Sequence, residues 1–160
     1  MIALLIVLCL CLAVIFWQDS KLRHIHVVLP IIVFVSAYFL TNYLQNNLKL
    51  IGVNVLFFCI TIALLTLYMS LKNKGFLNPF QNYFGLGDVL FYIAITPLFL
   101  LYNYVLFFIT SLLFAIVMQF VLRKWIKKDS VPLAGLSALL LLFIIAKDIW
   151  FPIQKITLIR

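Results

Sequence analysis

A series of apolar runs, each close to the length of a helix that crosses a bilayer, makes up most of this chain. A helix needs about 20 residues to span the hydrocarbon core. Hydrophobic residues make up 67% of the 160 residues and charged residues only 10%, against about 25% charged in an ordinary soluble domain. These properties exclude a soluble enzyme, a disordered chain and a secreted disulfide scaffold. They predict an all-α polytopic membrane protein in which residues 1–160 form a single transmembrane domain.

The first apolar run, Ile2 to Trp17, could be a signal peptide or a retained membrane helix. A signal peptide begins with a basic region and ends at a small-residue cleavage site. This run has no basic start, and no such site precedes Gln18 and Asp19. We therefore expect a retained helix.

The later runs complete a predicted bundle of six transmembrane helices. The stretch from Val89 to Leu122 is too long for one span. Pro97 and the Tyr102-Asn103-Tyr104 cluster offer a break, since proline interrupts helices and tyrosines suit the membrane interface. Asp129 and Ser130 can cap the last helix, with Pro132 in its first turn. The expected spans are Ile2–Trp17, Val27–Leu44, Ile51–Leu71, Gly87–Tyr102, Tyr104–Leu122 and Leu133–Phe151.

The basic residues orient this bundle. The net charge of +8 could indicate a nucleic-acid partner, but basic loops also set membrane orientation and contact anionic lipid headgroups. We favour the second interpretation and expect a lipid bilayer and no nucleic acid as partner. Six spans leave four basic residues on one face, and both termini lie there. The other face, which should be cytoplasmic, carries eight: Lys21, Arg23, Lys72, Lys74, Arg123, Lys124, Lys127 and Lys128.

The three cysteines, Cys9, Cys11 and Cys59, all lie in apolar runs. Their odd number and their spacing do not fit a disulfide framework or a zinc site. We expect small buried hydrophobic side chains, and the sequence implies no metal and no organic cofactor.

The acidic residues are few, and the expected topology separates them. All four are aspartates. Asp129 is expected in a basic loop, and Asp148 near the outer end of the last span beside Lys147. Asp19 and Asp88 are both expected at the cytoplasmic ends of spans. Two neighbouring carboxylates cannot both ionise cheaply, so one keeps a proton while the other can act as a base. An aspartic peptidase needs this division: one carboxylate deprotonates water and the other hydrogen-bonds the scissile carbonyl.

The residues around Asp88 form a motif. Gly85-Leu86-Gly87-Asp88 is a G-x-G-D sequence at the start of an expected membrane helix. With Asp19 at the end of the first helix, the chain resembles the type IV prepilin peptidases and archaeal preflagellin peptidases. The stretch from Asp19 to Ile25 is similar to that family's Asp-x-basic-x-basic-x-Ile pattern, in which Lys21 and Arg23 are the basic positions. The stretch from Val131 to Ala134 resembles the proline-containing start of the family's last helix.

The resemblance implies that Asp19 and Asp88 are the catalytic pair and that Gly85, Gly87, Lys21 and Arg23 belong to the motif or contact the substrate. It implies a six-helix endopeptidase of a prokaryotic cytoplasmic membrane, with its active site on the cytoplasmic side. The substrate would be a membrane-anchored, pilin-like precursor that is cleaved after a short basic leader. The resemblance leaves the oligomeric state and the particular precursor open.

Other interpretations stay open. The family usually reads Ile-Pro-Asn where this chain has Ile25-His26-Val27, and commonly has lysine where this chain has Leu90. These departures motivate the alternative of a catalytically inactive relative, or of a small membrane scaffold or transport subunit. Asp19 could simply pair with Arg23 one turn later. A scaffold predicts that the two aspartates point apart toward separate basic partners, whereas a peptidase predicts that they face one cleft.

Overall fold

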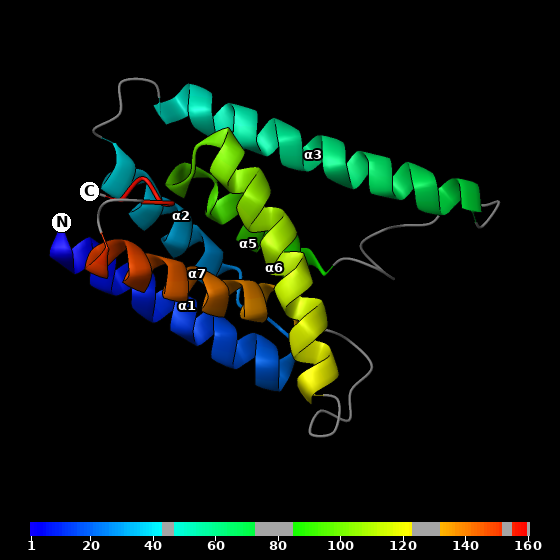
Figure 1. Ribbon diagram of the computed structural model, residues 1–160, viewed down its shortest axis with the longest axis horizontal. Helices are drawn as coiled ribbons and strands as arrows, with labels where there is room; N and C mark the ends of the chain where they lie inside the picture. Colours follow the sequence, from blue (N-terminus) through cyan, green and yellow to red (C-terminus); the bar gives the residue numbers. More distant parts are fainter. Residues whose placement is uncertain (43–46, 73–84, 123–131, 152–154, 160) are drawn as a thin grey trace.

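The computed structural model describes residues 1–42, 47–72, 85–122, 132–151 and 155–159. Regular structure in these residues is entirely helical (Figure 1). The elements, in chain order, are α1 (Ile2–Leu22), α2 (Val28–Thr41), α3 (Asn47–Lys72), α5 (Leu86–Ala94), the 3₁₀ turn η1 (Thr96–Leu98), α6 (Leu101–Leu122) and α7 (Leu133–Trp150).

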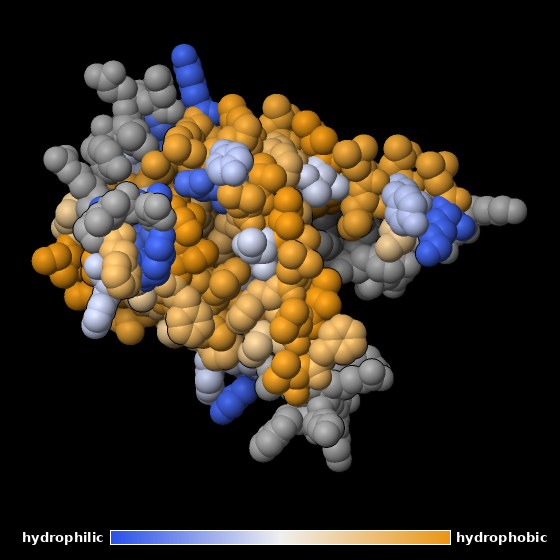
Figure 2. All heavy atoms as spheres, viewed as in Figure 1, coloured by the Kyte–Doolittle hydropathy of each residue, from blue (hydrophilic) through white to orange (hydrophobic). Residues whose placement is uncertain are grey.

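Four of the described helices, α1, α3, α6 and α7, are long and apolar enough to cross a membrane. Two apolar segments are shorter: α2, and the stretch Leu86–Leu98 that combines α5 with η1. Figure 2 shows apolar side chains over most of the visible face, as expected for a surface that meets lipid. The all-helical membrane architecture is therefore supported, and four helices have the length of a span.

The break between α5 and α6 lies at Pro97, earlier than the predicted boundary at residues 102–104. Proline has no amide hydrogen, and the chain passes through η1 and an extended Phe99 before α6 begins. The side-chain amide of Asn54 on α3 donates to the carbonyls of Thr96 and Phe99, at 2.9 and 2.8 Å. A polar side chain from another helix thus satisfies backbone groups that the break leaves without helical partners.

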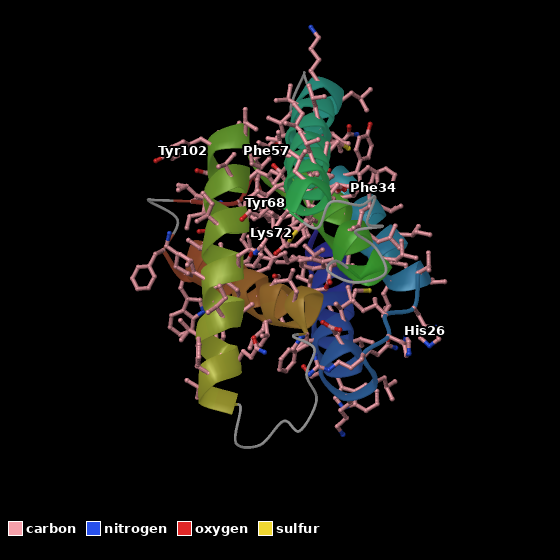
Figure 3. The ribbon with its side chains drawn as sticks, turned by 90° about the vertical axis from the view of Figure 1, so that its right-hand side faces the viewer. His26, Phe34, Phe57, Tyr68, Lys72 and Tyr102 are labelled. Carbon is pink, nitrogen blue, oxygen red and sulfur yellow. The ribbon has the colours of Figure 1, made fainter. Side chains whose placement is uncertain are left out.

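Aromatic side chains fill the centre of the bundle. Tyr92 of α5 packs between Phe58 of α3 and Phe108 of α6, with ring centroids 5.5 and 5.0 Å away. Phe57 lies between α3 and α6, whereas Tyr102 points away from the bundle (Figure 3). Tyr102 thus has the exposure expected of an interfacial tyrosine, but the second predicted one, Tyr104, is fully buried.

The cysteines differ from one another in burial. Cys11 is buried and Cys9 is half-buried, while Cys59 is exposed on α3. The prediction of buried hydrophobic side chains is therefore wrong for Cys59.

The two ends of the chain lie at the same end of the bundle (Figure 1). Asp148, near the end of α7, contacts Lys147 at 3.5 Å, which confirms the predicted pair. Asp148 is also only 4% exposed and accepts hydrogen bonds from the backbone amides of Ile156 and Thr157. It therefore fastens the C-terminal segment to α7.

Candidate active site at the start of α7

The candidate site forms where three helix ends meet. Asp19 lies in the last turn of α1, Asp88 lies in the first turn of α5, and both reach the first turn of α7. α1 and α7 run side by side over most of their length, which carries Asp19 to this end of the bundle (Figure 1). Residues 116 positions apart in the sequence thereby come into contact.

Both carboxylates accept hydrogen bonds from consecutive backbone amides of α7. Asp88 Oδ1 accepts from Ala134 N–H at 2.8 Å, and Asp19 Oδ2 accepts from Gly135 N–H at 2.6 Å. Since neighbouring amide nitrogens are less than a Cα–Cα step apart, these two oxygens lie at most about 9 Å from each other. The structure brings together the two aspartates that the sequence singled out.

α7 itself explains why carboxylates gather here. The first amides of a helix have no partner within the helix, and its positive dipole end attracts anions. The N-cap residue is Pro132, whose side chain makes no cap hydrogen bond. The predicted caps, Asp129 and Ser130, lie outside the described residues, and Pro132 stands just before the first turn instead of within it. Asp88 and Asp19 therefore cap α7 from two other helices.

The glycines of the G-x-G-D sequence have separate local roles. Gly85 is the N-cap of α5, and its amide donates to Asp88 Oδ2 at 3.2 Å. This contact ties the carboxylate back onto its own helix start and aims the other oxygen at α7. At Gly87, an added Cβ would lie 3.1 Å from the Ile25 side chain, so glycine there lets the segment after α1 pack against α5.

Gly135 permits a close approach between α1 and α7. An added Cβ would lie 3.0 Å from both Asp19 Cβ and Asp19 Oδ2, and 3.3 Å from the Phe16 carbonyl oxygen. The short bond between Gly135 and Asp19 therefore depends on the absence of a side chain at position 135. Gly135 was not among the residues that the sequence singled out, and the only pattern that pointed to it was its position directly after Ala134.

A buried polar network continues from the site into the bundle. Tyr92 lies one helical turn after Asp88, and its hydroxyl contacts Ser111 Oγ at 2.7 Å and Ser137 Oγ at 3.0 Å. All three side chains are fully buried or nearly so. The network links α5, α6 and α7, and its residues were not among those that the sequence singled out. The spacing of Tyr92 from Asp88 on one helix face was the available signal.

The basic motif residues occupy different surroundings. Lys21 is exposed, and its ammonium lies 5.0 Å from the centroid of the Trp17 ring. Arg23 ends α1 in a left-handed conformation with φ of 59°. No ion pair within 4 Å joins Arg23 to Asp19 in the described part of the chain, so the simple pairing one turn apart is not formed. His26 points away from the bundle (Figure 3).

Among the residues that the structure describes, the arrangement offers two carboxylates and backbone amides, with no further acidic side chain beside them. Within the described ranges, no three histidine, cysteine, aspartate or glutamate side chains lie together as a metal site would require. Asp19 is 7% exposed, while Asp88 is half-buried. A pair of neighbouring carboxylates of unequal burial is suited to acid–base chemistry on a bound water.

Comparisons with known protein families, with curated proteins and with solved structures gave no match for this chain.

Proposed function

We propose that this chain is a membrane aspartic endopeptidase that cleaves the basic leader of a pilin-like precursor at the cytoplasmic face of a prokaryotic membrane. The observation that carries the proposal is the convergence of Asp19 and Asp88 on consecutive amides of α7. The proposal includes a six-span bundle in which α2 and the Leu86–Leu98 segment also lie in the membrane.

The proposed chemistry is hydrolysis of one peptide bond by an activated water. The ionised aspartate removes a proton from water as its oxygen bonds to the scissile carbonyl carbon, and the protonated aspartate donates to the carbonyl oxygen. Collapse of the tetrahedral intermediate breaks the C–N bond, and the amine leaves with a proton from the first aspartate. The position of the pair at helix ends suits a substrate that is cut just outside its own membrane helix.

A structural alternative has a specific observation in its favour. Two carboxylates at the first turn of α7 satisfy amides that Pro132 leaves uncapped, and this alone stabilises a helix. A non-catalytic scaffold would need them only as caps. Asparagine can also cap a helix, because its side-chain oxygen accepts the same hydrogen bond. Replacing aspartate by asparagine thus separates the two functions.

The experiment reconstitutes the protein with a precursor that carries a short basic leader directly before an apolar helix. Asp19→Asn and Asp88→Asn should each abolish cleavage while the thermal unfolding temperature changes little. Asp148→Asn is the matched control at the opposite end of the bundle. It should lower stability by loosening the C-terminal segment, yet retain cleavage below its unfolding temperature. Retained cleavage in Asp19→Asn or Asp88→Asn would refute the proposal.

A further inference from the structure

A cavity lies at the end of the bundle opposite the two aspartates. It is enclosed by the start of α1, the ends of α2 and α7, and residues 155–159, which meet at the end that carries both chain termini (Figure 1). Its volume is about 260 Å³. Cavities of about 150 Å³ already bind benzene-sized molecules, so this one has room for a longer segment of an organic ligand.

The floor of this end cavity is apolar and buried. Leu40, Ile145 and Ile159 line it and are only 1–8% exposed. Leu5 of α1 adds a half-buried apolar side chain. Apolar cavities stay free of water and take up apolar molecules instead. The floor is therefore suited to hydrocarbon.

The one acidic side chain among the described residues that line the cavity is already engaged by the protein. Asp148 accepts a hydrogen bond from Ile156 N–H at Oδ1, and from Thr157 N–H and the Thr157 hydroxyl at Oδ2. Lys147 also lies 3.5 Å from Oδ1. Both carboxylate oxygens are therefore occupied, and Asp148 holds the wall of the cavity together instead of offering an acceptor to a ligand.

The rim of the cavity combines apolar side chains with one cation. Ile2 of α1 and Ile149 of α7 line the cavity and are more than half exposed, on helices long enough to span the membrane. Lys155 is exposed, and its ammonium donates to the Ile159 carbonyl at 3.2 Å. An ammonium has three hydrogens to donate, and no carboxylate lies within 4 Å of this one among the described residues. Lys155 can therefore bind an anion at the mouth of an apolar cavity.

We propose that the end cavity binds one acyl chain of an anionic phospholipid, with the lipid phosphate on the Lys155 ammonium. A bilayer surrounds this end of α1 and α7 with molecules that join a hydrocarbon chain to a phosphate, and basic pockets between membrane helices bind anionic headgroups. The apolar floor and the cation at the rim match these two parts. The site is independent of the proposed peptidase chemistry, because it lies at the other end of α1 and α7 from the two aspartates.

The test uses phosphatidylglycerol with a photoreactive diazirine at the end of one acyl chain, mixed into phosphatidylcholine vesicles that hold the protein. After illumination, mass spectrometry of peptides locates the label. Lipid outside the bundle reaches only exposed side chains, whereas a chain in the cavity should label Leu40 or Ile145, which are at most 3% exposed. Label confined to exposed residues such as Leu10 would overturn the proposal.

A filled cavity should lose this label. Leu5→Trp places a larger side chain in the cavity and should abolish labelling of the floor, while Leu10→Trp, the same change on the exposed side of α1, should leave it intact. Floor labelling that persists in a folded Leu5→Trp variant would contradict the proposed site.

The phosphate contact is tested at the exposed Lys155, where a substitution is compatible with folding. Lys155→Gln should lower the preference of floor labelling for phosphatidylglycerol over phosphatidylcholine, each carrying the same diazirine, by about fivefold. Lys155→Arg should keep the preference. Lys49→Gln, at an exposed lysine of α3, makes the same change in net charge and should also keep it. Equal losses in Lys155→Gln and Lys49→Gln would overturn the assigned contact.

Two other occupants give distinct results. Floor labelling by a diazirine fatty acid but not by the phospholipid would overturn the phospholipid assignment. A lipid-free dimer in native mass spectrometry, with no label on the floor, would show that a second copy covers this end and would also overturn it. None of these measurements requires cleavage of a precursor.

Discussion

Gly135→Ala tests whether the approach of α1 to α7 sets the position of Asp19. The new methyl group would lie 3.0 Å from Asp19 Cβ and Oδ2 and 3.3 Å from the backbone oxygen of Phe16. Carbon atoms pack best at about 3.5–4.0 Å. The backbone oxygen cannot rotate away, so we expect α1 and α7 to separate and the 2.6 Å bond from Gly135 N–H to Asp19 to lengthen.

The size of the effect follows from two opposing terms. Overpacking costs about 1–3 kcal/mol, while replacing glycine by alanine inside a helix gains about 0.5–1 kcal/mol. The difference between these ranges is roughly 0–2.5 kcal/mol, so we expect a free energy of unfolding that is lower by about 1 kcal/mol. If the proposed function holds, the clash displaces the carboxylate by a few tenths of an ångström and lowers the cleavage rate, by less than the about 100-fold that a displacement of about 1 Å costs.

Gly52→Ala provides the matched control. Gly52 lies on α3, where an added Cβ meets nothing within 4 Å. This variant should be unchanged or slightly more stable, with full activity. The measurements are thermal unfolding in detergent and precursor cleavage. If Gly135→Ala matches Gly52→Ala in both, the close contact between α1 and α7 does not position Asp19.

Three further predictions concern the fold. Asn54→Leu removes the donor to two buried carbonyls at the α5–α6 break and should lower the free energy of unfolding by about 1–3 kcal/mol, measured by thermal unfolding. Tyr92→Phe removes contacts to two serine hydroxyls and should cost about 1 kcal/mol, with faster hydrogen exchange in α5. The six-span topology can be tested with single cysteines introduced into a background without native cysteines. A membrane-impermeant thiol reagent should label Lys21→Cys and Lys72→Cys from one side of the membrane and Lys49→Cys from the other. Labelling of all three from one side would refute the six-span topology.

The general architecture could be predicted because the length and hydrophobicity of each segment determine, independently of the other segments, whether it can span the bilayer. The run from Ile2 onward predicted a helix, and the structure extends it to Leu22. The extension includes Asp19, which lies two residues beyond the predicted end of the span at Trp17. A helix can continue through polar residues when another element supplies their hydrogen-bond partners, and here the Gly135 amide of α7 donates to Asp19.

The position of the α5–α6 break was predicted less well. Pro97 was identified, but the boundary was placed at the later tyrosine cluster. The break at Pro97 is stabilised by Asn54, more than 40 residues earlier in the chain, and no local pattern reveals that partner. Burial of Tyr104 has the same origin, because its hydroxyl donates to the Tyr92 carbonyl across the bundle.

The two carboxylates of the site could be predicted from the sequence, but the residues that surround them could not. Asp19 and Asp88 stood out because charged residues at membrane depth are rare. Gly135, Ser137 and Tyr92 look like ordinary helix residues in the sequence, and their importance arises from tertiary contacts alone.

We propose that Asp19 and Asp88 act as one catalytic pair. The decisive measurement compares precursor cleavage by the wild type, Asp19→Asn, Asp88→Asn and the double variant, each folded in the same lipid. When two residues act as a unit, the effects of substituting them are not additive, so each single variant should lose about as much activity as the double variant. Small, additive losses that follow the unfolding temperature would contradict the claim and leave the two aspartates as caps of α7.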